Sequence, residues 1–278
     1  MKKYIVWSFC AFVLSGCQSF SEIIDYSHYG NRIAAESGFT KEYVKTDSFT
    51  ITTYKKINNS GEPITFYIEG DGLSWISKTR ISRDPTPKDP IGLKLALNDD
   101  SDNVIYVARP CQFSTYMDSL CKDNSYWTNK RFSEEVVASL NQAITKLTLR
   151  YQVKGVHLVG YSGGGAVAVL IAARRYDVLS LRTVAGNLDH MALNNYHNVS
   201  QMPESLNPID VVAQIKGLPQ YHFLGAEDEI VPGFIVDGFV EAVGDDSCVQ
   251  TAVLDGVGHK KGWVAQWADL LKKPIVCD

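Results

Sequence analysis

Residues 156–166 constrain the fold more than any other stretch, because they join three patterns in a fixed order. An apolar, β-branched run leads into Gly160-x-Ser162-x-Gly164, and small apolar side chains follow at 166–173. This order predicts a strand, a sharp turn and a helix, with the Ser162 hydroxyl held above the end of a sheet. Glycines suit the flanking positions because side chains there would collide with the crossing strand and helix. The alternative is a glycine-rich turn that only packs closely.

The N-terminus has the pattern of a secretory signal. Two lysines precede an apolar run at 4–14, which is too short to span a bilayer. The run ends Leu14-Ser15-Gly16-Cys17, which resembles the bacterial lipobox. The resemblance implies a signal peptide at 1–16 and a lipid on Cys17 that anchors the protein in the bacterial cell envelope. Gln18, in place of Asp, implies sorting to the outer membrane. The alternative is an ordinary secreted protein with an incidental cysteine.

The remaining chain is long enough for one large α/β domain. We expect a polar tether and docking segment at 17–45 and the domain at 46–278. A hydrophobic content of 45% and a charged content of 21% are ordinary for a globular protein, and a net charge of −4 gives no reason to expect nucleic-acid binding. The oligomeric state does not follow from the sequence.

Six cysteines are present, and four of them lie beyond the signal and Cys17. An even number in an oxidising compartment predicts two disulfides. Three pairings are possible, of which we favour Cys111–Cys121, which closes a short loop, and Cys248–Cys277, which ties the last strand to the tail. A zinc site is the alternative, but the spacing fits no paired Cys-x-x-Cys pattern, so no metal is expected.

Strand and helix patterns alternate along the rest of the chain. Besides the strand that leads into Gly160, strands are predicted at 48–54, 64–68, 103–108, 181–185, 221–224 and 249–254, and helices at 91–98, from Ser133 onward and at about 263–271. The alternation predicts an α/β fold with a mostly parallel sheet and helices on both faces. Residues 187–217 are expected to form a small cap insertion, in which His190 and His197 are surface or lid residues rather than metal ligands.

Two late loops carry an acid and a histidine. Gly225-Ala226-Glu227-Asp228 follows one strand, and Gly258-His259 follows the last strand. Together with Ser162, this chain order resembles the α/β-hydrolase superfamily over most of residues 49–271. The resemblance implies Asp228 as the acid, with Glu227 and Glu229 as near alternatives, and His259 as the base.

The loop Glu69-Gly70-Asp71-Gly72 follows the strand at 64–68, where that fold keeps half of its oxyanion hole. We expect the N–H of Asp71 or Gly72, together with the N–H of Gly163, to stabilise an oxyanion. The family motif commonly begins His-Gly, and the sequence does not explain Glu69. The alternative is a tight turn capped by Asp71.

These roles imply hydrolysis through an acyl-serine, with a small-molecule acyl substrate and no metal or organic cofactor. We expect a carboxylic ester of small or medium size. The alternatives are a peptidase, a thioesterase, or a non-catalytic envelope lipoprotein that uses the scaffold for binding.

Overall fold

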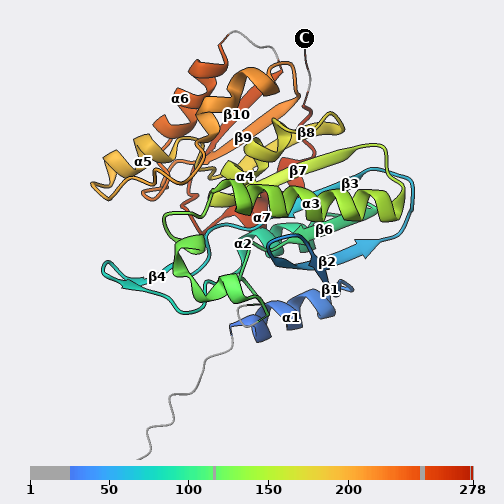
Figure 1. Cartoon of the computed structure of the whole chain (residues 1–278). Helices are drawn as coiled ribbons and strands as arrows, with labels where there is room; N and C mark the ends of the chain where they lie inside the picture. The colour runs from blue at the N-terminus through green and yellow to red at the C-terminus, as the bar shows by residue number, and fades with distance from the viewer. Residues whose placement is uncertain (1–25, 115–116, 245–247, 276, 278) are drawn as a thin grey trace, which may run out of the picture.

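One eight-stranded sheet runs through the protein in the order β1-β2-β6-β3-β7-β8-β9-β10 (Figure 1). The computed structural model describes residues 26–114, 117–244, 248–275 and 277. Strand β2 pairs antiparallel with both β1 and β6, and all neighbours from β6 to β10 are parallel. The strands are β1 Thr40–Lys45, β2 Thr50–Ile57, β3 Ile64–Ile68, β6 Asn103–Val107, β7 Val156–Tyr161, β8 Val178–Val184, β9 Gln220–Gly225 and β10 Val249–Leu254. The predicted fold class is confirmed.

Helices cover both faces of the sheet. They are α1 Ser27–Glu36, α2 Ile91–Leu97, α3 Glu134–Tyr151, α4 Gly163–Ala172, α5 His190–Tyr196, α6 Phe234–Val243 and α7 Trp263–Leu271, with the short 3₁₀ helices η1 Ser119–Lys122, η2 Asn124–Trp127 and η3 Pro208–Ile215. The core under α3, α4, α6 and η3 is separate from the core under α1, α2 and α7. Neighbouring strand residues such as Phe66 and Tyr67 point into opposite cores, because successive side chains of a strand alternate between faces.

The first strand lies earlier in the chain than the sequence indicates. Strand β1 pairs with β2 in register from Thr40 opposite Lys55, and Tyr54 donates a 2.6 Å hydrogen bond to Asn31 of α1. The domain boundary predicted at residue 46 is therefore too late. Strand β1 was missed because it is an edge strand with one buried residue, Val44, and so lacks the apolar alternation of a half-buried strand.

Other elements agree with the sequence to different degrees. Strands β3 and β10 and helix α7 have the predicted bounds, whereas helix α6 and the hairpin β4 Trp75–Ser77 with β5 Arg80–Ile81 were not predicted. The cap insertion contains α5 and η3. Both halves pack on the core, since Leu188, Leu193 and Met202 from the first half and Ile215 from the second half are buried in it.

Both favoured disulfides are present. Cys111 pairs with Cys121, and Cys248 pairs with Cys277. The first bond joins the loop after β6 to η1, and the second joins the residue before β10 to the C-terminal tail.

The described helices include none that is both long enough and apolar enough to cross a membrane. The predicted signal peptide and the lipid site at Cys17 lie outside the described residues.

Candidate active site

Ser162 occupies the turn between β7 and α4. Its backbone has φ 52° and ψ −121°, a conformation that L-residues rarely adopt. The turn is tight enough to require glycine on both sides, since a Cβ on Gly160 would lie 2.3 Å from the Gly164 carbonyl oxygen, and a Cβ on Gly164 would lie 2.2 Å from that of Ile68. The strand, turn and helix predicted from the motif are therefore present.

Two loops at the same edge of the sheet bring the other predicted residues to Ser162. His259 follows β10, and its Nε2 lies 3.0 Å from Ser162 Oγ. Asp228 follows β9, and its Oδ2 lies 2.8 Å from His259 Nδ1. The three side chains form one hydrogen-bonded row because parallel strands present their following loops at one edge.

Asp228 is distinguished from its acidic neighbours by burial. Its side chain is 1% exposed, and its Oδ1 accepts hydrogen bonds of 2.9 Å from the N–H groups of Ile230 and Val231. Glu227 and Glu229 are exposed. The carboxylate that faces the histidine is therefore Asp228.

The His259 backbone is fixed by two side chains that the sequence did not single out. The Tyr161 hydroxyl donates a 2.9 Å hydrogen bond to the His259 carbonyl, and Trp263 Nε1 donates another of 3.1 Å. Burial and nearby carboxylates raise the pKa of Tyr161, which keeps the phenol protonated as a donor. Tyr161 immediately precedes Ser162, so its position beside the motif was the available signal.

Glu69 has a structural role that the sequence left unexplained. Its buried carboxylate accepts hydrogen bonds from the N–H groups of Gly70, Gly92 and Leu93 and from the Tyr106 hydroxyl, at 2.9 to 3.2 Å. Gly92 and Leu93 are in the first turn of α2, where backbone N–H groups lack intrahelical acceptors. Glu69 thus ties the loop after β3 to the start of α2. Burial raises the pKa of its carboxyl, against the effect of these hydrogen bonds.

The peptide between Gly70 and Asp71 is also held in orientation. Gln112 Nε2 donates a 2.9 Å hydrogen bond to the Gly70 carbonyl, and Gln112 Oε1 accepts one of 3.1 Å from the Arg109 N–H. In a trans peptide the C=O and N–H point in opposite directions, so the Asp71 N–H points away from Gln112. A Cβ on Gly70 would lie 3.3 Å from Ser162 Cβ, so this peptide borders the serine.

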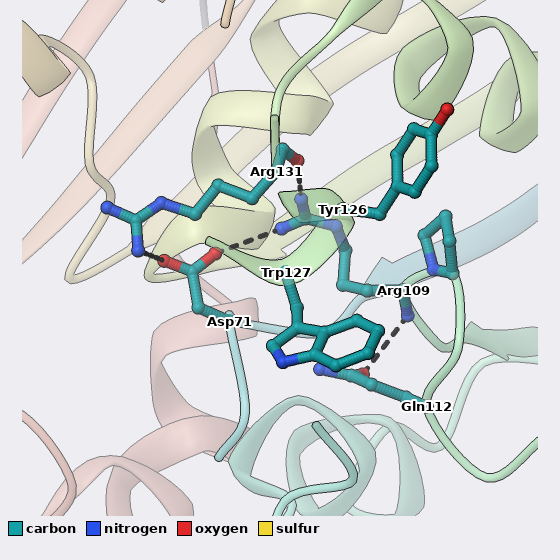
Figure 2. Close-up of a pocket in the computed structure, with 7 residues that line it drawn as sticks. Asp71, Arg109, Gln112, Tyr126, Trp127 and Arg131 are labelled. Carbon is teal, nitrogen blue, oxygen red and sulfur yellow. Dashed lines mark hydrogen bonds and ion pairs between the residues drawn. The ribbon is translucent and has the colours of Figure 1, made fainter. Parts of the chain in front are cut away.

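The Asp71 side chain forms a charged cluster beside the serine (Figure 2). Its carboxylate lies between the guanidinium groups of Arg109, at 3.2 Å, and Arg131, at 3.3 Å. Arg109 Nη2 also donates to the Arg131 carbonyl. On the other side, a Cβ on Gly163 would lie 2.0 Å from Asp71 Oδ1, so the carboxylate occupies the space that a side chain at 163 would need.

This cluster closes a small pocket. Its lining residues are Asp71, Arg109, Pro110, Gln112, Tyr126, Trp127 and Arg131. The Arg109 and Arg131 side chains are 5% and 18% exposed, and the Nε atoms of both are buried without a hydrogen-bond partner among the described residues. Burial lowers the pKa of Arg109, whereas Asp71 opposes that effect. With two arginines and one aspartate, these three side chains carry a net charge of +1.

The two histidines of the cap insertion, His190 and His197, contact other parts of the protein. His190 lies in the cap insertion as predicted, but at 2% exposure it is not a surface residue, because it packs on Phe132 with ring centroids 5.9 Å apart. His197 is exposed, and its ring lies 2.7 Å from the Ile230 carbonyl. Within the described residues, no group of three or more His, Cys, Asp or Glu side chains is arranged to bind a metal.

No protein-family model matches the chain, and no curated protein matches it. Solved structures do. An esterase from Pyrococcus furiosus has a TM-score of 0.60 at 14% identity over 85% of this chain and 92% of its own. Est1E from Butyrivibrio proteoclasticus has a TM-score of 0.55 at 12% identity, over 84% and 96% of the two chains. An alpha-beta serine hydrolase homologue from Coxiella burnetii has a TM-score of 0.55 at 15% identity, over 84% and 95%. At these identities the likeness establishes the fold.

Proposed function

We propose that this chain, which has the α/β-hydrolase fold, is a serine hydrolase that cleaves carboxylic esters through an acyl-serine. The observation that carries the proposal is the row of hydrogen bonds from Ser162 Oγ to His259 Nε2 and from His259 Nδ1 to Asp228 Oδ2. A serine hydroxyl needs such a base to become nucleophilic, and the base needs an acceptor at its other nitrogen.

In the proposed reaction, Ser162 Oγ attacks the ester carbonyl carbon while His259 Nε2 takes the hydroxyl proton. The tetrahedral oxyanion collapses, the C–O bond to the alcohol breaks, and His259 returns its proton to the leaving alkoxide. Water then attacks the acyl-serine with His259 again as base, which releases the acid and restores Ser162. Asp228 stabilises the imidazolium throughout.

The oxyanion would be stabilised by backbone N–H groups of Gly163 and of Asp71 or Gly72. Gly163 is the first residue of α4, so its N–H has no intrahelical acceptor and lies at the positive end of the helix dipole. The orientation of the Gly70–Asp71 peptide by Gln112 supports Asp71 as the second donor. One such donor is typically worth about 3 kcal/mol in the transition state.

The test is labelling of the full chain with a fluorophosphonate probe. We expect labelling of wild type, none of Ser162→Ala, and a loss on the order of 10⁴-fold in rate for Asp228→Asn. Glu227→Gln and Glu229→Gln are matched controls because both carboxylates are exposed beside Asp228. Folded, oxidised wild type that does not react would favour the alternative of a non-catalytic binding protein.

Substrate class is tested separately on matched esters, thioesters and anilides of one acyl group. Preferential turnover of the ester supports the proposal. Preference for the anilide or the thioester would instead indicate the peptidase or thioesterase alternative, with Ser162→Ala as the blank in each assay.

We also propose that the protein is a lipoprotein of the bacterial cell envelope, anchored through Cys17 and sorted to the outer membrane. Support comes from residues 1–18 alone. Palmitate incorporation in wild type but not in Cys17→Ser, followed by membrane fractionation, tests the anchor and its location. Incorporation that survives in Cys17→Ser would contradict it.

A further inference from the structure

The hairpin β4–β5 is an exposed structure at the rim of the site. It follows β3 in the same loop as Asp71, and Figure 1 shows it extending away from the body of the protein. It forms a separate two-stranded sheet. Isolated hairpins of this size are marginally stable, so a fold that keeps one needs an anchor for it.

The base of the hairpin is anchored and its tip is not. Ser82 N–H donates a 2.9 Å hydrogen bond to the Ser74 carbonyl, and the buried Trp127 donates one of 3.1 Å from Nε1 to the Ser82 carbonyl. Beyond this base, Trp75 is 43% exposed and Ile76 is 49% exposed. A rigid base therefore presents two large apolar side chains to solvent.

The same segment is cationic. Lys78, Arg80 and Arg83 are exposed, and residues 72–83 contain no acidic side chain. Among the described residues, none of these three cations forms an ion pair. Asp84 follows Arg83 directly, so residues 72–84 carry a net charge of +2 on a chain whose net charge is −4.

Other exposed apolar side chains lie at the same edge of the sheet. Met191 and Tyr196 of α5 are 51% and 56% exposed, and Ile230 and Phe234 beside the Asp228 loop are 53% and 45% exposed. Tyr196 and Phe234 are in ring contact, with centroids 5.3 Å apart. Because α5 and the Asp228 loop follow parallel strands, they share the edge of Ser162 with the hairpin.

We propose that the β4–β5 hairpin docks onto an anionic lipid bilayer, with Trp75 and Ile76 at the level of the headgroups and the upper acyl chains. Tryptophan is favoured at that depth, and each basic residue near an anionic leaflet contributes about 1 kcal/mol. A protein partner is less consistent with two exposed apolar side chains on a short hairpin, since a stable protein–protein interface buries about 800 Å² on each partner. Docking in this way sets the mouth of the Ser162 site against the membrane, whether or not the site is catalytic.

Bromine quenching of tryptophan fluorescence tests this placement. The full chain carrying Trp7→Phe has Trp75 as its exposed indole, since Trp127, Trp263 and Trp267 are at most 5% exposed. It is mixed with phosphatidylcholine vesicles that carry brominated acyl chains, with and without phosphatidylglycerol. We expect quenching on the anionic vesicles, which weakens as salt is added.

The charge variants make the test specific. Lys78→Gln with Arg80→Gln should weaken insertion about 30-fold, from about 1 kcal/mol for each cation. The matched control is Lys154→Gln with Lys216→Gln, two exposed lysines that precede β7 and β9 at the opposite edge, and it should quench like wild type. Circular dichroism establishes that each variant is folded.

Three results would overturn the proposal. The first is no bromine quenching on anionic vesicles. The second is equal loss in the hairpin and control variants, which would indicate a general charge effect. The third is binding to heparin that depends on the hairpin while vesicles leave Trp75 unquenched, which would indicate a polyanion rather than a bilayer.

Discussion

The buried carboxylate of Glu69 offers the sharpest test of how the loop beside Ser162 is held. Glu69→Ala removes the acceptor for three buried N–H groups, those of Gly70, Gly92 and Leu93. Each unpaired buried donor costs about 1–3 kcal/mol, so we expect a loss of at least about 3 kcal/mol in the free energy of unfolding. Glu69→Gln keeps one oxygen and turns an amide donor toward one backbone N–H, so its loss should be about 1–3 kcal/mol.

The contribution of Glu69 to the free energy of unfolding should decrease as the pH rises. Burial raises the pKa of Glu69 above the ordinary value of 4.5. Above pH 4.5 the unfolded chain has lost a proton that the folded protein still holds, so this group's contribution to stability falls as pH rises through the folded pKa. Glu69→Gln has no such contribution, so the gap in stability between wild type and Glu69→Gln should narrow as pH rises.

The assay is urea unfolding of the full chain, with its disulfides intact, followed by circular dichroism from pH 4.5 upward. Tyr106→Phe is the control, because it removes one donor to the same carboxylate and should cost about 1 kcal/mol. If Glu69→Ala costs no more than Tyr106→Phe, the backbone N–H groups find other acceptors and the anchoring argument is wrong.

Three further predictions follow from the same structure. Cys111→Ser with Cys121→Ser opens a loop with a sequence separation of 10 and should lower the free energy of unfolding by about 3 kcal/mol in urea, whereas an unchanged midpoint would contradict it. Burial lowers the pKa of His222 from 6.5 to about 3. As the pH falls below 6.5, the contribution of His222 to the free energy of unfolding should therefore decrease by about 1.4 kcal/mol per pH unit, and His222→Gln should lack this slope in the same urea assay. Arg131→Met removes one of the two positive charges that offset the Asp71 carboxylate beside the proposed oxyanion site. In steady-state kinetics we expect it to lower kcat about tenfold at similar KM, and Arg131→Lys to restore kcat. Equal loss of kcat in both variants would instead indicate structural damage.

Patterns among neighbouring residues were sufficient to predict the features that a short stretch of sequence determines. The turn at Ser162 was predictable because its glycines and its flanking strand and helix are contiguous in sequence. The placement of Asp228 and His259 beside Ser162 was predictable because each residue directly follows a recognisable strand. The two disulfides were predictable because the alternatives were few and a short loop favours closure.

The rest depends on contacts between distant residues. Glu69 was unexplained because its acceptor role involves Gly92, 23 residues later in the chain. The burial of His190 depends on Phe132, which comes from a different loop. Strand β1 is in the sheet through backbone pairing with β2, and such pairing leaves little trace in an edge strand whose side chains mostly face water.

Another set of contacts between distant residues involves the loop after β6. Arg109 and Gln112, which hold Asp71 and the Gly70 carbonyl, flank Cys111, the residue that the disulfide ties to Cys121. Cys111 itself has a φ of 68°, a conformation that is costly for a residue with a side chain and persists only where the surroundings enforce it. The disulfide therefore does more than close a surface loop, because it holds the side chains that orient the peptide beside Ser162. A variant without this disulfide that keeps the fold need not keep the orientation of the peptide beside Ser162.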